Sequence, residues 1–207
     1  MELRCKVKSN AMLLRLAEAL DYEFNGEIIT QINDLPNLPE DFSIGLIVGP
    51  SGGGKTTLLE SIGKPKAPRW SAFSSVFCHF SSYEEAEEKF AAVGFNSIPQ
   101  KFLPYHKLSN GEKFRCDLAR TLDNGAIIDE FTSVVNRDVA KSASSAIKRY
   151  VDKKQLKKIV IASCHYDIIE WLRPDWTYNV QTEEFHSGRY LRRPEIKIDI
   201  HKTDWKM

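Results

Sequence analysis

The feature that most constrains the fold is an apolar run that ends in a glycine-rich loop. The run "FSIGLIVG" stops at Gly49, and "GPSGGGKTT" occupies residues 49–57. Such a short apolar run predicts a buried strand, and the loop matches the phosphate-loop pattern GxxxxGK followed by Ser or Thr. Because a phosphate loop joins a strand to the start of a helix, we expect a helix from about Gly54 to Ile62.

The loop has the chemistry of an anion site. Small residues allow backbone N–H groups to close around phosphate oxygens, and a helix N-terminus adds positive potential. Lys55 is expected to reach the β- and γ-phosphates, and the Thr56 hydroxyl to hold Mg²⁺. A glycine-rich turn before a helix is the alternative, and the strand and helix on either side argue against it. The predicted phosphate-binding residues are Gly49, Ser51, Gly52, Gly53, Gly54, Lys55, Thr56 and Thr57.

A second apolar run, "AIIDE", ends in Asp129 and Glu130. After a phosphate loop, such a strand end favours Asp129 as a Mg²⁺ ligand, directly or through water. Glu130 would then polarise the attacking water, acting as a general base near the nucleophile. Two solvated acids at a strand end are the alternative.

The stretch "KLSNGEKF" begins a helix, with Ser109 as the expected N-cap and Glu112 closing a capping box. "LSNGE" also resembles the signature motif of the ABC ATPase family, usually written LSGGQ, with Asn110 in place of a glycine. The resemblance implies that Ser109 and Gly111 contact a γ-phosphate held by the other protomer. A bare helix N-terminus with a serine and a glycine suits such an anion.

Two further segments resemble ABC ATPases in the same order along the chain. "EFTSVVNRD" resembles the segment from Walker B to the D-loop, with Asn136 where an aspartate is usual. His165 in "IASCHYD" follows a strand, as the switch histidine does, and the resemblance implies a hydrogen bond to the γ-phosphate. The resemblance covers roughly residues 25–190 and implies Lys55, Glu130 and His165 as the catalytic residues.

The chain also departs from the family pattern. Transporter ATPases place a glutamine where the expected strand "SAFSSVFCHF" ends, and residues 79–81, "HFS", stand there instead. Gln100 is the only glutamine between the phosphate loop and the signature, and it lies too close to Ser109 to be assigned as a Mg²⁺ ligand. The aromatic residue that stacks on the base is expected to be Tyr22 or Phe24.

Strands that alternate with helices argue for an α/β fold with a largely parallel sheet. Ser82 and Gly94 are the expected caps of one helix, and a C-terminal hairpin is expected to turn at Ser187-Gly188. The expected elements are helices at 12–20, 82–94, 137–152 and 166–172, strands in "EIITQ", "SAFSSVFCHF" and "KIVIAS", and the hairpin over 176–192.

The family resemblance implies a P-loop NTPase of ABC ATPase type with a C-terminal β-hairpin. It implies an ATPase domain at 1–192, a small helical signature lobe at 81–122, and a tail at 193–207. The tail "RRPEIKIDIHKTDWKM" resembles the junction into a further domain. "LSNGEKFRCDLAR" and "CHYDIIEWLRPDW" resemble a soluble branch of the family, found in bacteria and phages and often joined to an acetyltransferase-like domain.

Composition sets the class of protein and not its chemistry. Of 207 residues, 42% are hydrophobic and 28% charged, and the formal net charge of +1 gives no bulk attraction to nucleic acid or anionic membrane. The N-terminus "MELRCKVKSN" lacks the apolar stretch of a signal peptide. We expect a cytoplasmic chain with no direct membrane insertion. The cysteines, expected as free buried thiols, are Cys5, Cys78, Cys116 and Cys164.

The function implied by the resemblance is a soluble ABC-type ATPase. Such a protein binds MgATP and hydrolyses it to ADP and phosphate in an ATP-sandwiched homodimer, driving a partner that the sequence does not name. The alternatives are the ATP-binding subunit of a transporter and a nucleotide-gated switch that binds DNA or protein. Asn136 and a basic cluster motivate the switch; a solvated helix end is the other interpretation of the cluster. The cluster comprises Lys148, Arg149, Lys153, Lys154, Lys157 and Lys158.

Overall fold

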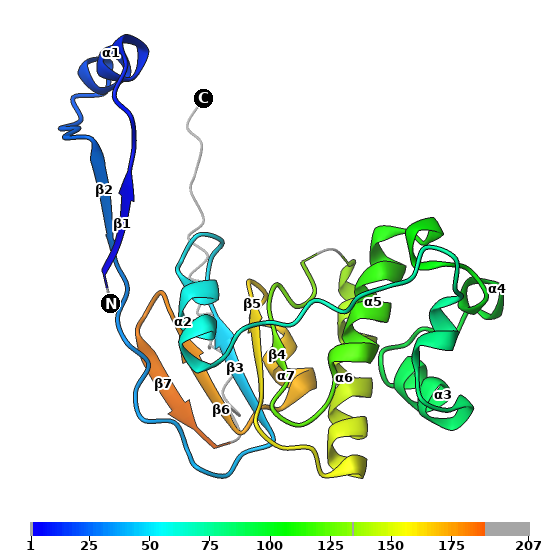
Figure 1. The fold of residues 1–207 in the computed structure, drawn as a ribbon. Helices are drawn as coiled ribbons and strands as arrows, with labels where there is room; N and C mark the ends of the chain where they lie inside the picture. The colour runs from blue at the N-terminus through cyan, green and yellow to red at the C-terminus, as the bar shows by residue number, and fades with distance from the viewer. Residues whose placement is uncertain (1, 134, 189–207) are drawn as a thin grey trace, which may run out of the picture.

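The computed structural model describes residues 2–133 and 135–188 and is drawn in Figure 1. In chain order its strands are β1 (Glu2–Lys6), β2 (Glu27–Gln31), β3 (Ile44–Val48), β4 (Ile127–Ile128), β5 (Ile159–Ser163), β6 (Trp176–Asn179) and β7 (Glu184–Ser187). Its α-helices are α1 (Ala11–Ala19), α2 (Lys55–Ile62), α3 (Tyr83–Ala92), α4 (Ile98–Lys101), α5 (Asn110–Thr121), α6 (Arg137–Lys154) and α7 (Ile168–Leu172). The tail expected at 193–207 lies outside the described residues.

The core of the protein is a five-stranded sheet in the order β4-β5-β3-β6-β7. Strands β4, β5, β3 and β6 run parallel, and β7 pairs antiparallel with β6. Val48, at the carboxyl end of β3, lies beside Ser163 of β5 and Asn179 of β6. The expected largely parallel sheet is therefore confirmed, and the loops after β3, β4 and β5 emerge at one edge, where ligands bind in open α/β sheets.

Helices cover both faces of this sheet, which explains why its central strands are apolar throughout. All five residues of β3 and all five of β5 are buried. On one face, Ile47 and Val160 pack in a cluster with Leu58 and Leu59 of α2. Alternate residues of the same strands, such as Leu46, belong to a second cluster with α5, α6 and α7.

Helices α3, α4 and α5 form a lobe at one side of the sheet (Figure 1). Its centre is aromatic, because the Phe90 ring centroid lies 5.0 Å from that of Phe80 and 5.0 Å from that of Phe95. Helix α5 begins as predicted, with Ser109 as the N-cap and a complete capping box with Glu112. The signature segment therefore starts the helix that leads from the lobe back to β4.

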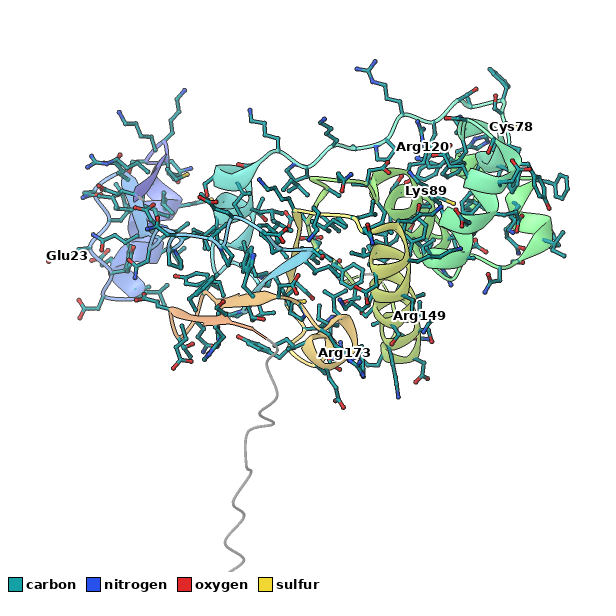
Figure 2. The ribbon with its side chains drawn as sticks, turned by 90° about the horizontal axis from the view of Figure 1, so that it is seen from below. Glu23, Cys78, Lys89, Arg120, Arg149 and Arg173 are labelled. Carbon is teal, nitrogen blue, oxygen red and sulfur yellow. The ribbon has the colours of Figure 1, made fainter. Side chains whose placement is uncertain are left out.

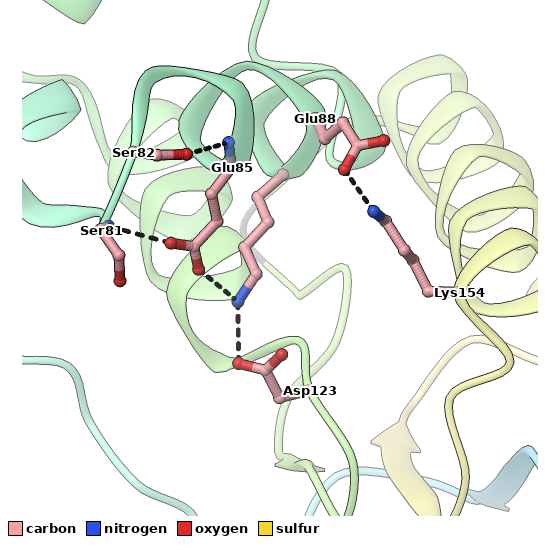
Figure 3. Close-up of polar contacts among 7 residues, drawn as sticks. Ser81, Ser82, Glu85, Glu88, Asp123 and Lys154 are labelled. Carbon is pink, nitrogen blue, oxygen red and sulfur yellow. Dashed lines mark hydrogen bonds and ion pairs between the residues drawn. The ribbon is translucent and has the colours of Figure 1, made fainter.

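Ion pairs hold α3 against its neighbours (Figure 3). Lys89 is buried, and its Nζ lies 2.8 Å from Asp123 Oδ2, just before β4, and 3.4 Å from Glu85 Oε1. From the same helix, Glu88 Oε2 lies 2.6 Å from Lys154 Nζ at the end of α6. A buried ammonium is tolerated only when it is paired. These contacts therefore link the lobe to both the sheet and α6.

The N-terminal strands form a separate unit. Strands β1 and β2 pair in a two-stranded antiparallel sheet, and α1 lies in the segment that connects them. The unit projects away from the core (Figure 1). The helix expected at 12–20 is present as α1, but none of its residues is buried. Strand β1 was not expected from the sequence. Large exposed apolar side chains of the unit are Met12, Leu14, Leu16, Leu20, Tyr22, Ile28 and Ile29.

The strand expected in "SAFSSVFCHF" is wrong. The segment forms a 3₁₀ turn over Val76–His79, and Ser75 makes only an isolated bridge with Pro104. The Ser75 hydroxyl caps the turn by accepting from the Phe77 backbone N–H at 3.1 Å. The apolar residues that suggested a strand instead pack into the lobe, where Val76 is fully buried.

The turn of the C-terminal hairpin was also placed wrongly. Strands β6 and β7 form the hairpin, but Asn179 pairs with Glu184, so the turn lies at 180–183. Ser187 is the last residue of β7 and pairs with Trp176. The sequence at the true turn, "VQTE", lacks glycine, and Glu183 adopts the left-handed conformation that glycine would favour, at φ 60°.

The expectation for the cysteines holds only in part. All four are free, and Cys116 is buried, which raises the pKa of its thiol to about 12. Cys5 and Cys78 are exposed, because Cys5 lies in the two-stranded N-terminal unit and Cys78 in the 3₁₀ turn. Within residues 2–133 and 135–188, none of the helices has the length and apolar character needed to cross a bilayer.

Candidate active site

The phosphate loop joins β3 to α2, as its sequence predicts. Gly54 caps α2 with φ 84° and without a side-chain cap, so the first N–H groups of the helix lack a side-chain acceptor there. A Cβ on Gly54 would lie 2.6 Å from Ile32 Cδ1, which leaves no room for a larger residue. Backbone N–H groups at a helix start, closed in by small residues, form an anion site.

Lys55 folds back over this loop. Its Nζ donates a hydrogen bond of 2.7 Å to the carbonyl oxygen of Pro50, near the start of the loop. The ammonium is therefore held above the same backbone whose N–H groups are available to an anion. A phosphate on the loop would offer this ammonium a charged acceptor in place of a neutral carbonyl.

The acidic strand end lies directly against the phosphate loop. The Thr56 hydroxyl donates a hydrogen bond of 2.7 Å to Asp129 Oδ2. Asp129 Oδ1 accepts from the Glu130 backbone N–H at 2.8 Å, so both carboxylate oxygens are fixed. A hydroxyl and a carboxylate at this separation are hard oxygen donors of the kind that Mg²⁺ prefers.

Glu130 follows at the start of a strained loop. Its backbone φ is 48°, which is uncommon for a residue with a side chain. Its carboxylate is exposed, and no hydrogen bond or ion pair ties it to any other residue that the structure describes. The structure therefore brings Lys55, Thr56, Asp129 and Glu130 to one edge of the sheet, with the Glu130 carboxylate free to contact a ligand.

His165 lies in the loop after β5 and is half-buried. Its Nδ1 is 2.9 Å from Thr132 Oγ1, and its backbone N–H donates to Ser163 Oγ at 3.1 Å. Burial lowers the pKa of the imidazole, and the positive charge of Arg137 lowers it further. The ring is therefore neutral near pH 7. Arg137 is itself ion-paired with Asp167, two residues beyond the histidine.

The sequence did not single out Thr132 or Ser163. Ser163 Oγ donates to the Phe131 carbonyl oxygen at 2.9 Å, and Thr132 is fully buried beside it. No local pattern marks these residues, because their contacts join loops that are far apart in the chain. The one available signal was position: Thr132 follows Glu130 closely, and Ser163 comes two residues before His165.

Within one chain, the signature residues Ser109 and Gly111 lie away from the phosphate loop. Ser109 Oγ donates a hydrogen bond of 2.7 Å to Glu112 Oε2, and the backbone N–H of Ser109 donates to the same oxygen. These two hydrogen bonds lower the pKa of the Glu112 carboxyl. Helix α5 packs on the loop after Glu130, with Gly111 near Val135. Helix α5 packs in the cluster on one face of the sheet and α2 in the cluster on the other face (Figure 1), so one chain does not bring the start of α5 to its own phosphate loop.

Three further residues make contacts that do not involve the phosphate loop. Asn136 is the N-cap of α6 and accepts from the Val139 N–H at 2.9 Å. Gln100 lies on α4 in the lobe and bonds with Ser97. His79 accepts from the Ser71 N–H at 2.9 Å, which fastens the segment between α2 and the lobe.

The aromatic residues weighed for base stacking lie far from the loop. Figure 2 shows Glu23, which lies between Tyr22 and Phe24, at the outer edge of the N-terminal unit. Strand β2 separates this edge from Ile32, which is the residue that packs on Gly54. Within one chain, therefore, neither Tyr22 nor Phe24 lies beside the phosphate loop.

Four of the six cations of the basic cluster make ion pairs within the chain, with three carboxylates between them. Its ion pairs are Lys148–Asp152, Lys153–Glu88, Lys154–Glu88 and Lys157–Asp41. Arg149, which is exposed on α6 (Figure 2), and Lys158 make no ion pair with a described residue. This arrangement matches a solvated helix end more closely than a nucleic-acid contact surface.

Comparison with known proteins agrees with this geometry. No family model matches the chain, and no curated protein matches it either. The dimeric structure of MJ0796, described as a bacterial ABC transporter cassette, has a TM-score of 0.57 at 14% identity and covers 82% of this chain and 95% of that chain. The ATP-binding cassette MJ0796 in a post-hydrolysis state with ADP and Pi gives 0.58 at 15% identity with the same coverage. The fold is therefore that of a P-loop NTPase of ABC ATPase type.

Proposed function

We propose that the protein binds MgATP and hydrolyses it to ADP and phosphate, using two copies of the chain arranged head to tail. The observation that carries this proposal is the 2.7 Å contact between Thr56 Oγ1 and Asp129 Oδ2, which joins the phosphate loop to the acidic strand end. In the proposed roles, Lys55 and His165 contact the γ-phosphate and Glu130 orients the attacking water. Catalysis of this kind is mostly positioning and electrostatic stabilisation.

Magnesium is part of this proposal because the donor atoms suit it. Thr56 and Asp129 are the residues that would hold the ion. When bound, Mg²⁺ neutralises charge on the phosphate oxygens. The chain's own contribution is to keep the hydroxyl and the carboxylate at one place on the sheet edge, and to leave the neighbouring Glu130 carboxylate unpaired among the described residues.

Two copies are proposed because one chain leaves the site incomplete. Helix α5, which Ser109 caps, lies across the sheet from α2, which Lys55 begins. A second copy turned head to tail would present its Ser109 and Gly111 to the phosphate on the first. The dimeric cassettes that share the fold support this arrangement.

The experiment is ATP turnover measured against protein concentration with Mg²⁺. Specific activity is expected to rise with concentration in the wild type and to vanish in Glu130→Gln, which should still bind ATP. Glu23→Gln is the matched control, because Glu23 is an exposed carboxylate at the far edge of the N-terminal unit. Normal turnover in Glu130→Gln would remove the role proposed for that carboxylate.

The partner that turnover drives is a separate proposal. We propose residues 1–192 as the ATPase domain, 81–122 as its signature lobe, and 193–207 as a junction to an acetyltransferase-like partner. The support is the sequence resemblance of the tail, which lies outside the described residues. Capture of a separately expressed acetyltransferase-like domain by the full chain, lost when 193–207 is deleted, is the expected result.

A transporter subunit is the second candidate, because the structures that share the fold include one described as a transporter cassette. Co-purification of a membrane permease with the chain would favour it. A nucleotide-gated DNA switch has less support, since most lysines of the basic cluster are paired within the chain.

A further inference from the structure

We propose that Thr132 is a positioning residue that fixes the tautomer of His165, with the ring proton on Nε2 and Nδ1 as an acceptor. The observation is the 2.9 Å contact between Thr132 Oγ1 and His165 Nδ1, made by a side chain that is fully buried. A histidine held in this way can donate from Nε2 to a phosphate oxygen. That consequence rests on the proposed ATPase function, whereas the tautomer itself does not.

The backbone at Thr132 shows that this contact is maintained against a local preference. Its φ is 71°, in the left-handed region that β-branched residues rarely adopt. The loop is held there by the Phe131 N–H, which donates to the Ala162 carbonyl at 2.9 Å, and by a turn in which the Ser133 N–H donates to the Glu130 carbonyl at 3.0 Å. Strained backbone of this kind clusters at functional sites.

The hydroxyl proton of Thr132 has two acceptors within reach, the Phe131 carbonyl and His165 Nδ1. Ser163 Oγ gives its own proton to the Phe131 carbonyl at 2.9 Å and accepts the His165 backbone N–H at 3.1 Å. Thr132 Oγ1 is also within hydrogen-bond distance of the Phe131 carbonyl, at 2.5 Å, but that carbonyl already accepts the Ser163 proton. The proposal therefore gives the Thr132 proton to Nδ1 of the imidazole, at 2.9 Å.

The state of the ring completes the assignment. Burial and the charge of Arg137 lower the pKa of His165, so near pH 7 the ring holds a single proton. If Nδ1 accepts from Thr132, that proton lies on Nε2. The hydroxyl therefore acts on the ring as an orienting partner acts on a metal-ligating histidine, through the nitrogen that does not contact the ligand.

The position of Thr132 links two loops of the candidate site. It follows Glu130, proposed to orient the attacking water, and it touches His165, proposed to contact the γ-phosphate. Loss of the hydroxyl is therefore expected to lower kcat while the KM for ATP changes little, because the phosphate loop itself is untouched.

The test is ¹⁵N NMR of histidine-labelled full-length chain near pH 7.5 without nucleotide, with His165 identified from the His165→Gln spectrum. The wild type is expected to show a bare Nδ1 and a protonated Nε2. Thr132→Val is expected to mix the two tautomers and to lower kcat by about tenfold, as the loss of an orienting partner typically does. Thr132→Ser, which keeps the hydroxyl, should retain both the tautomer and the rate.

A wild-type His165 that carries its proton on Nδ1 overturns the proposal, and so does an unchanged tautomer in Thr132→Val. If Thr132→Val does not fold, the wild-type spectrum and Thr132→Ser still decide. If His165 has the expected tautomer but the chain shows no ATP turnover, the result counts against the ATPase function. The positioning role of Thr132 then still holds.

Discussion

Thr56 Oγ1 and Asp129 Oδ2 lie 2.7 Å apart, although their residues are 73 positions apart in the chain. The contact exists because α2 starts after β3, β4 ends before Asp129, and both strands run parallel in one sheet. It turns two local sequence patterns into one candidate metal site. The same edge of the sheet also carries the loop that places His165.

The first prediction concerns Asp129, the proposed metal ligand. Asp129→Asn keeps the shape of the side chain and removes its charge, so Mg²⁺ is expected to bind about 10–100-fold more weakly. The measurement is ATP turnover against Mg²⁺ concentration, after EDTA treatment of each variant. Asp21→Asn, an exposed carboxylate just after α1 in the N-terminal unit, is the control. An Asp129→Asn curve that overlays the wild type would contradict the assignment.

Lys55 is expected to be needed for nucleotide binding. Its ammonium already reaches the Pro50 carbonyl across the loop, so a bound phosphate gains a charge-assisted contact without rearrangement of the chain. Lys55→Ala should abolish ATP binding in calorimetry, and Lys64→Ala, an exposed lysine just after α2, should not. Equal affinity in both variants would show that the loop binds phosphate through its backbone alone.

The fit of Gly54 gives a prediction about stability. Gly54→Ala adds a Cβ that would lie 2.6 Å from Ile32 Cδ1, at a φ of 84°. Gly52→Ala carries the same kind of backbone strain at φ 77°, but a Cβ there meets nothing within 4 Å. Strain alone costs about 1–2 kcal/mol, so both should be destabilised in denaturant unfolding and Gly54→Ala by more. Equal losses would mean that Ile32 moves aside freely.

Some of the fold followed from local chemistry, and some did not. The strand before the phosphate loop, the capping box at Ser109 and the N-cap at Ser82 were predicted because each depends on neighbouring residues. The 3₁₀ turn at Val76–His79 was missed because its apolar residues are buried by the lobe and not by strand partners. Tertiary packing decides the structure of this segment, and a short stretch of sequence does not show which distant residues will pack against it.

The candidate site shows the same division. Lys55, Asp129 and Glu130 could be placed from motifs, since their strands and loops fix them. The contact of Thr132 with His165 could not, because it depends on the register of β4 beside β5. The motifs predict which groups contact a ligand, and those assignments stay predictions; no motif predicts the contact between Thr132 and His165.

The link between α3 and α6 is expected to depend on pH. Hydrogen bonds from Lys153 and then Lys154 lower the pKa of the Glu88 carboxyl from 4.5 to about 2. Because the folded-state pKa is the lower one, the contribution of this link to stability is fully present above about pH 4.5 and is lost as the pH falls through about 2. The difference in Tm between the wild type and Glu88→Gln should therefore shrink below pH 4.5.

Glu84→Gln, on the same helix and exposed, is the control for that measurement, and its Tm difference from the wild type should not follow the same curve. A difference for Glu88→Gln that stays constant from pH 7 to pH 2 would show that the lysines do not hold the carboxylate in solution. The experiment reports only on the contact between α3 and α6, because Glu88 lies on α3 and not at the candidate site.

Mixing two inactive variants tests whether the site is shared between copies. Lys55→Ala removes the phosphate-loop contact and Ser109→Ala the signature contact, so each variant alone is expected to lack turnover. A mixed head-to-tail dimer pairs the intact loop of one chain with the intact Ser109 of the other. Random mixing makes about half the dimers mixed, each with one complete site, so about a quarter of the wild-type activity should return.

Stability must be separated from chemistry in this test, because Ser109 also caps α5. Loss of an N-cap costs about 1 kcal/mol, so Ser82→Ala, which removes the equivalent cap of α3, is the matched variant. It should be destabilised to a similar degree in denaturant unfolding and should keep its turnover. No recovery of activity in the mixture, with both chains folded and associated, would mean that each copy uses its own signature segment or none. Recovery would place Ser109 of one chain at the phosphate of the other.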